Sequence, residues 1–233
     1  MSESALLEIR ELCVSYGHSQ VLFGVDLVVT GHGAVAVLGR NGAGKSTLLK
    51  TIVGELAPRS GSIALNLQDI TRVRTERRIR SGVGYVPQEQ SVFSKLSVRE
   101  NLEIGALTNP DKSAIDRVLA RLPKLGQRLH QQAGSLSGGE RKMLAIGRAM
   151  VSSPRLLLLD EPTEGLWIGI VQEIAECLRE LMKEAAIVIV EQHLEFALGL
   201  ADYAYVLDRG RVALQGRASA VREDPRLAQF LAP

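Results

Sequence analysis

Short apolar runs recur along the chain and alternate with segments whose apolar residues have helical spacing. The runs lie at residues 34–38, 156–159 and 186–190, and residues 46–53 and 170–183 have the helical pattern. Strands that are apolar throughout are typical of parallel sheets covered on both faces. We therefore expect an α/β protein with a mostly parallel sheet.

The two ends of the chain carry more strand signals. Residues 6–9, 13–16 and 25–29 predict strands with loose alternation, and residues 62–65 and 83–86 predict two more. Near the C-terminus, residues 203–207 and 212–214 flank a hairpin turn at 208–211. The final residues, 225–231, predict a short helix.

The middle of the chain has a different character. Ser97 and Glu100 have capping-box spacing, and residues 114–122 have helical periodicity up to Pro123. No strong strand pattern interrupts this region. We expect a helical subdomain over residues 88–150, inserted between the α/β segments 1–87 and 151–233 of a single domain.

Charge and composition exclude several classes of function. The net charge is only +2 over 233 residues, and no stretch of 18 apolar residues occurs. Five arginines lie within residues 71–80. They could form a nucleic-acid patch, but the small net charge and the lack of interleaved aromatics favour a solvated helix face. Any membrane role would therefore come through a partner.

Residues 39–47 match the phosphate-loop pattern G-x-x-x-x-G-K-[ST]. They lie between an apolar strand pattern and a helix pattern, which directs a helix N-terminus at phosphate. In this pattern Lys45 reaches the outer phosphates of a nucleotide and Ser46 ligates Mg²⁺. The alternative, a glycine-rich turn, does not explain this context.

A pair of carboxylates ends the apolar run at 156–159. Ligands of open α/β sheets bind where strands end, so Asp160 is a candidate for holding Mg²⁺ and Glu161 for activating water. Two solvated loop carboxylates are the alternative. The phosphate loop upstream favours the functional interpretation.

Residues 136–140 form a second unusual segment, Leu-Ser-Gly-Gly-Glu. Ser137 and Glu140 have the spacing of a capped helix start, which is the alternative to a functional role. Two glycines there leave backbone N–H groups uncovered, which suits an anion.

Together, the phosphate loop, Gln88, the segment 136–140 and the carboxylate pair resemble the ATPase subunits of ABC transporters, in the order and spacing of that family and over nearly the whole chain. The fold that this resemblance implies is a P-loop NTPase (RecA-like) core with an N-terminal antiparallel β subdomain and an inserted helical subdomain. Residues 84–88, 136–148, 160–166 and 190–192 look most like ATPases of importers for branched-chain amino acids, urea or short amides.

The resemblance also implies roles for single residues. Tyr16 would stack on adenine, unless it is a core tyrosine, and Glu161 would be the catalytic carboxylate. Mg²⁺ would be surrounded by Ser46, Gln88 and Asp160. The phosphates of ATP would be held by Gly39, Arg40, Asn41, Gly42, Ala43, Gly44, Lys45, Ser46 and Thr47. Ser137, Gly138 and Gly139 would contact ATP bound by a second chain.

The implied partners are a second ATPase subunit, identical or similar, and transmembrane permease subunits. A periplasmic solute-binding protein would act indirectly, and no nucleic acid is expected. The chain would lie peripherally on the cytoplasmic face of the inner membrane. An exporter or envelope-lipid ATPase is the first alternative, and a soluble ABC ATPase acting on nucleic acid or ribosomes is the second.

Two positions depart from the family pattern. Trp167, the single tryptophan, follows Gly165-Leu166 where an aspartate is usual. Gln192 occupies the place of the usual switch histidine, and His193 follows it either as a substitute or as a bystander. Both Gln192 and His193 are candidate catalytic residues.

Overall fold

The computed structural model describes residues 5–89 and 91–231. A six-stranded sheet has the order β10-β9-β3-β8-β7-β6, and all of its pairs are parallel except β10 with β9. Its strands are β3 (Gly33–Leu38), β6 (Val83–Val86), β7 (Leu156–Asp160), β8 (Ala186–Glu191), β9 (Tyr203–Asp208) and β10 (Arg211–Arg217). The predicted mostly parallel sheet is confirmed.

A second sheet is antiparallel, with the order β2-β1-β4-β5. It is built from β1 (Ala5–Tyr16), β2 (Ser19–Thr30), β4 (Ser60–Leu65) and β5 (Gln68–Asp69). The sequence predicted two strands where β1 is one long strand. Register shifts on both sides of Leu12 let β1 stay paired with β2 while its alternation is broken.

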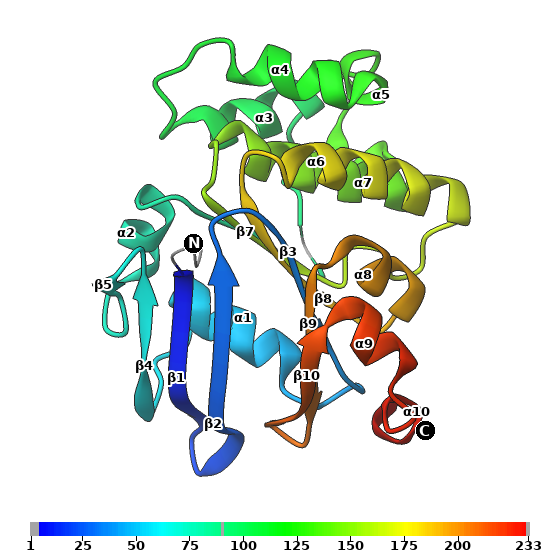
Figure 1. The fold of residues 1–233 in the computed structure, drawn as a ribbon. Helices are drawn as coiled ribbons and strands as arrows, with labels where there is room; N and C mark the ends of the chain where they lie inside the picture. The colour runs from blue at the N-terminus through cyan, green and yellow to red at the C-terminus, as the bar shows by residue number, and fades with distance from the viewer. Residues whose placement is uncertain (1–4, 90, 232–233) are drawn as a thin grey trace.

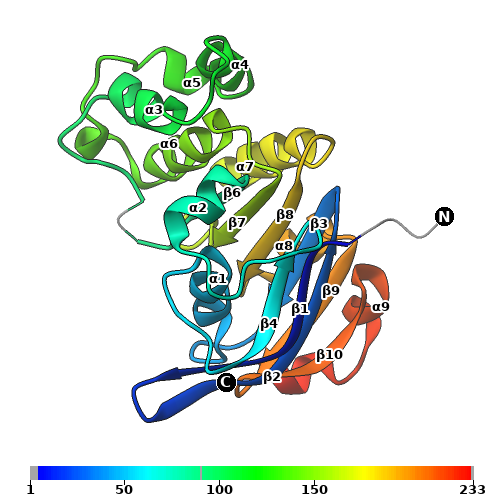
Figure 2. The same ribbon diagram turned by 90° about the vertical axis from the view of Figure 1, so that its left-hand side faces the viewer.

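Helix α1 (Lys45–Val53) lies between the two sheets (Figures 1 and 2). Its Leu48, Leu49 and Ile52 are fully buried and belong to one apolar core with residues of both sheets. The phosphate-loop helix is therefore fixed from two sides.

The opposite face of the parallel sheet is covered by α6 (Gly138–Val151) and α7 (Ile168–Leu181). Leu157 and Leu159 of β7 point into this core, whereas Leu156 and Leu158 point towards α1. Alternate side chains of β7 enter two different apolar cores, which explains why residues 156–159 are all apolar.

Between β6 and β7 the described residues form helices alone: α3 (Val98–Ala106), α4 (Ala114–Arg121), α5 (Pro123–Gly126), a 3₁₀ turn at Ala133–Ser135, and α6. Ser97 and Ser137 each begin a helix with a complete capping box, as predicted. Helices α3 to α5 lie beyond α6 as a separate layer (Figure 1). The boundaries 88–150 stay a prediction.

The remaining helices are α2 (Thr75–Arg80), α8 (Leu194–Leu200), α9 (Ala218–Glu223) and α10 (Leu227–Leu231). The sequence prediction of a solvated α2 is wrong for Arg78, which is 1% exposed. In the described part of the chain, no helix is long and apolar enough to cross a bilayer.

Candidate functional site

The loop at 39–47 joins the carboxyl end of β3 to the start of α1, as its sequence predicts. Gly44 is left-handed at φ 104°, and a Cβ there would lie 2.6 Å from Leu22 Cδ2. Only glycine combines this backbone with such a close approach. The backbone N–H groups at the start of α1 thus stay open to an anion.

Lys45 is 4% exposed and folds back over the loop. Its Nζ donates to the carbonyl oxygens of Gly39 at 2.9 Å and Arg40 at 3.1 Å. The same ammonium lies 3.3 Å from Glu161 Oε1. A buried cation is therefore placed between the loop and the predicted catalytic carboxylate.

The Glu161 carboxylate is 4% exposed and is surrounded by donors from three segments. Oε1 accepts from Gln192 Nε2 at 3.0 Å, and Oε2 accepts from Gln88 Nε2 at 3.0 Å. Gln192 Nε2 also donates to Asn41 Oδ1 at 2.7 Å. The structure thus brings together Asn41, Lys45, Gln88, Glu161 and Gln192, which are far apart in the sequence.

Asp160 occupies the last position of β7 and is 2% exposed. Ser46 Oγ donates to its Oδ1 at 3.0 Å, so the two residues predicted to hold Mg²⁺ are in contact. Burial raises the pKa of Asp160, and the neighbouring Glu161 raises it further, against the Ser46 hydrogen bond. A buried carboxylate of this kind favours a nearby cation.

The donor set fits Mg²⁺ bound together with phosphate. No group of three or more His, Cys, Asp or Glu suited to a metal occurs within residues 5–89 and 91–231. Mg²⁺ typically takes one or two protein carboxylates and completes its shell with phosphates and water. The Tyr85 hydroxyl is also buried with no hydrogen-bond partner among the described residues, and Asp160 adds to the effect of burial in raising its pKa. These residues suit a cation held largely by its nucleotide.

Three groups of predicted residues lie outside this network. The Tyr16 side chain is 46% exposed, with its hydroxyl 3.5 Å from Thr47 Oγ1, so it is available for stacking. Ser137 Oγ accepts from Glu140 N at 3.3 Å, and Gly138 has open space where a Cβ would lie. The His193 ring stacks on Phe196, and it forms no hydrogen bond to Glu161 among the described side chains.

A cavity of about 660 Å³ separates the start of α6 from the turn that follows Glu161. Gln88, Gly138 and Glu164 line it. In one chain, therefore, Gly138 lies across a cavity from Gln88 and Glu164.

Sequence reasoning missed two buried ionisable residues here. Lys142 is 7% exposed and its Nζ donates to the Gln88 carbonyl at 3.0 Å, while burial lowers its pKa. Glu191 is 2% exposed and accepts hydrogen bonds from the turn after Glu161. Glu191 ends the apolar run at 186–190, the same signal that singled out Asp160.

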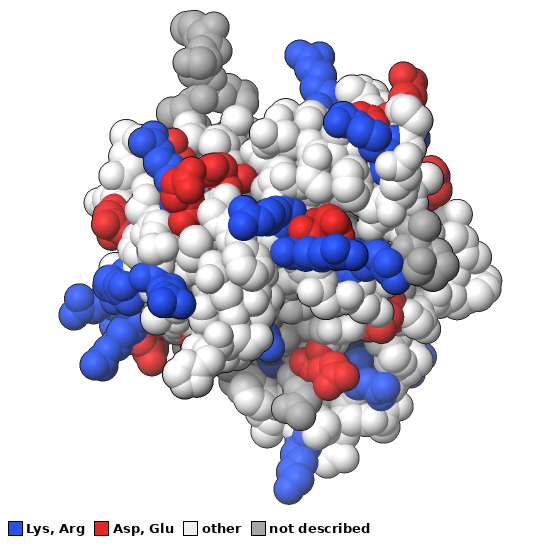
Figure 3. Space-filling view, turned by 90° about the horizontal axis from the view of Figure 1, so that it is seen from below, with Lys and Arg blue, Asp and Glu red and all other residues white. Residues whose placement is uncertain are grey.

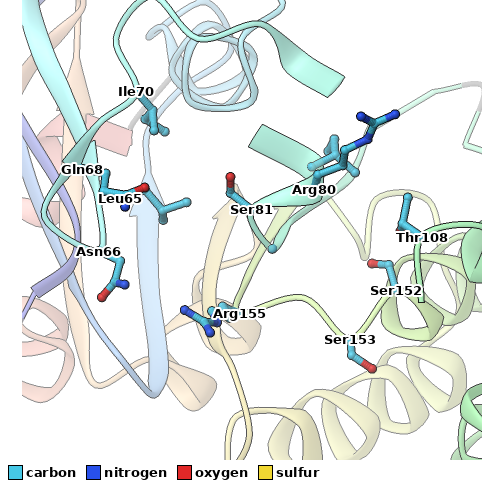
Figure 4. Close-up of a pocket in the computed structure, with 12 residues that line it drawn as sticks. Leu65, Asn66, Gln68, Ile70, Arg80, Ser81, Thr108, Ser152, Ser153 and Arg155 are labelled. Atoms are coloured by element: carbon cyan, nitrogen blue, oxygen red, sulfur yellow. The ribbon is translucent and has the colours of Figure 1, made fainter. Parts of the chain in front are cut away.

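A cavity of about 480 Å³ lies at the other end of the sheet, beside the amino ends of β6 and β7 (Figure 4). Its two arginines, Arg80 and Arg155, are exposed and point in opposite directions. None of the predicted site residues lines it. Because ligands of open α/β sheets bind at the carboxyl ends of strands, this cavity is not the nucleotide site.

Comparison with known proteins agrees with this geometry. The family model described as ABC transporter matches residues 22–164. The branched-chain amino acid transport ATP-binding protein BraG of Pseudomonas aeruginosa is 41% identical, over 95% of this chain and 97% of its own length. LivF of Archaeoglobus fulgidus, named for the same transport, is 39% identical over 97% of this chain and 98% of its own length.

A solved nucleotide-free ATP-binding cassette from an ABC transporter has the same fold. It superposes with a TM-score of 0.88 and 26% identity, covering 99% of this chain and 100% of its own. The chain belongs to the ABC transporter family, as a nucleotide-binding subunit with ATPase activity.

Proposed function

We propose that this chain powers an ABC importer for small polar solutes such as branched-chain amino acids, urea or amides. The observation that carries the proposal is the Glu161 carboxylate, held by Lys45, Gln88 and Gln192 beside the phosphate loop. The solute class is supported by the relatives BraG and LivF, which are named for branched-chain amino acid transport.

ATP is bound through the phosphate loop, with Tyr16 stacking on the adenine. The N–H groups of residues 39–47 and the Lys45 ammonium hold the phosphates. Ser46, Gln88 and Asp160 would hold Mg²⁺, which would supply positive charge beside the phosphates. When ATP binds, the Lys45 ammonium exchanges its hydrogen bonds to the Gly39 and Arg40 carbonyls for hydrogen bonds to phosphate.

Glu161 accepts a proton from the water that attacks the γ-phosphate. Gln88 and Gln192 each donate to one of its oxygens, so both orient the carboxylate. Gln192 also contacts Asn41 of the loop. A neutral amide at 192 orients groups without taking up a proton.

The site is completed by a second chain, identical or similar to this one. Ser137, Gly138 and Gly139 of each chain contact the γ-phosphate of ATP bound by the other. The open space at Gly138 and its place at the start of the 14-residue helix α6 support this role. ATP draws the chains together, and hydrolysis separates them.

The other subunits are membrane permeases, fed by a periplasmic solute-binding protein, and the chain is peripheral on the cytoplasmic face of the inner membrane. Residues 88–150 form a helical subdomain that transmits motion to the permeases. We propose no nucleic-acid partner, because the net charge is only +2 and acidic side chains lie among the basic ones on the face that Figure 3 draws.

Replacement of Glu161 tests the mechanism. Glu161→Gln keeps the size and shape of the side chain, so the dissociation constant for ATP should stay within about threefold. Turnover should fall at least about 10²-fold, which is the typical contribution of a general base. Phosphate release and equilibrium binding of labelled ATP measure the two effects. Near-normal hydrolysis by the variant would contradict the assignment of Glu161.

Uptake of labelled solutes tests the import assignment. A strain lacking this gene should lose uptake of one class of small polar solute, and the wild-type chain should restore it while the Glu161→Gln variant does not. Unchanged uptake together with altered envelope lipid would favour the exporter alternative.

A further inference from the structure

Glu161 has an unusual backbone conformation for a residue with a side chain. Its φ is +46°, in the left-handed region, and Pro162 follows it. This conformation costs free energy in any residue except glycine, so it persists only where the surroundings fix it. Glu161 N donates to the Val190 carbonyl at 2.9 Å, which fixes one side of the turn.

The other side of the turn is fixed by Glu191. Its Oε1 accepts from Thr163 N at 2.9 Å and from Thr163 Oγ1 at 2.7 Å. Glu191 and Thr163 are 2% and 5% exposed, so water does not compete with these bonds. The segment that carries the Glu161 carboxylate is thereby attached to the end of β8.

The second oxygen of Glu191 holds the segment that carries Gln192. Oε2 accepts from Gln192 N at 3.1 Å and from His193 N at 3.2 Å. The Gln192 side chain in turn donates to Glu161 Oε1. One buried carboxylate therefore fixes both the segment that carries Glu161 and the segment that carries Gln192.

The Glu191 carboxylate is the acceptor in all four of these hydrogen bonds, two on each oxygen. A carboxylate accepts on both oxygens, whereas the isosteric amide of glutamine accepts on only one. Glutamine at 191 would place an NH₂ group against the donors of one segment. These four donors therefore require a carboxylate at position 191, and a side chain of the same size that is not a carboxylate does not satisfy them.

We propose that Glu191 is a positioning residue for ATP hydrolysis, which sets the place of the Glu161 carboxylate relative to Gln192 without touching substrate. The proposal deepens the function proposed above and rests on it. Misplacement of a catalytic group by about 1 Å costs on the order of 10²-fold in rate. Nucleotide binding, which depends on residues 39–47, should be insensitive to Glu191.

The first test is Glu191→Gln in the full chain. We expect kcat to fall about 10- to 100-fold, with the KM and the dissociation constant for ATP within about twofold and the melting temperature within a few degrees. A kcat within about twofold of wild type, or an equal loss in ATP binding, would overturn the proposal.

Thr163 provides a matched pair that leaves the Glu191 carboxylate in place. Thr163→Val removes one of the four hydrogen bonds, and Thr163→Ser keeps it. The valine variant should lower kcat by several-fold and the serine variant should restore it. If Glu191→Gln does not fold, this pair decides, since equal kcat values for valine and serine would overturn the proposal.

Amide hydrogen exchange separates this proposal from the proposed function, because it needs no turnover. In Glu191→Gln, the backbone amides that face the new NH₂ group should exchange at least tenfold faster. These are the amide of Thr163 or the amides of Gln192 and His193. The exchange rates of the amides in α1 should not change. A wild-type chain that fails to hydrolyse ATP together with its ATPase and permease partners would contradict the proposed function, whereas unchanged exchange in the variant would contradict the role of Glu191.

Discussion

Gly139 lies so close to Ile170 that the position has no room for a side chain. A Cβ at 139 would come within 2.7 Å of Ile170 Cγ2, whereas a Cβ at Gly138 would meet nothing within 4 Å. Ile170 belongs to the first turn of α7 and Gly139 to the first turn of α6. The two adjacent glycines therefore serve different purposes: Gly139 permits helix packing, and Gly138 leaves a surface open.

Alanine at each glycine should separate these purposes. Gly139→Ala forces α6 and α7 apart and should destabilise the chain by about 1–3 kcal/mol. Gly138→Ala should leave stability unchanged or raise it by up to about 1 kcal/mol, since alanine favours a helix. Thermal unfolding of the two nucleotide-free variants measures the difference. Equal stability of the two variants would contradict the packing role of Gly139.

Arg78 stabilises the end of α1 from a fully buried position. Its guanidinium donates to the carbonyl oxygens of Thr51, Ile52, Val73 and Thr71 at 2.7 to 3.1 Å. Arg78→Met should destabilise the chain by about 3 kcal/mol, because it leaves buried carbonyls without donors. Exposed Arg77→Met is the matched control and should change stability by less than about 0.5 kcal/mol. Urea unfolding checks both, and similar midpoints would refute this role.

The sequence predicted the local features of the fold well. The strand, loop and helix around residues 39–47 and the capping boxes at Ser97 and Ser137 each depend on neighbouring residues alone. The unbroken apolar runs correctly indicated strands buried on both faces.

The missed features depend on contacts between distant segments. Arg78 looks like one of five solvated arginines until α1, 26 and 27 residues earlier, supplies the carbonyls that bury it. Glu191 was recognisable as a carboxylate at a strand end, but its role depends on Thr163. No local pattern reveals such pairings.

The charge on Asp160 should weaken the nucleotide-free protein. Burial raises its pKa above the ordinary 3.8, so the folded state holds the proton more tightly than the unfolded state does. The contribution of Asp160 to stability therefore falls as the pH rises from 3.8 through the raised pKa. Above the raised pKa the buried charge is present and unfavourable.

Asp160→Asn should consequently stabilise the nucleotide-free chain at pH 7, by about 1 kcal/mol or about 2–4 °C. The gain should shrink as the pH is lowered through the raised pKa of Asp160. The variant should also lose the extra stabilisation that Mg²⁺ adds to ATP binding. Scanning calorimetry at several pH values measures these effects, and a variant less stable than wild type at pH 7 would contradict the expectation.

Trp167 reports directly on the proposed pairing of two chains. It is the single tryptophan, it is 73% exposed, and its ring lies across Gly169, where a Cβ would come within 2.1 Å of Cζ3. If a second chain covers this surface, Mg²⁺-ATP should shift the emission of the Glu161→Gln variant to shorter wavelength. Quenching by acrylamide should fall at least about twofold, as expected for an aromatic side chain buried at an interface.

The protein concentration supplies the control for this experiment. A shift caused by pairing should grow with the concentration of the chain and should accompany a doubling of mass in analytical ultracentrifugation. Ser137→Arg should abolish both changes, because a bulky cation blocks the surface proposed to meet the partner's nucleotide. An emission shift that is independent of concentration, without a change of mass, would instead place the movement of Trp167 within one chain.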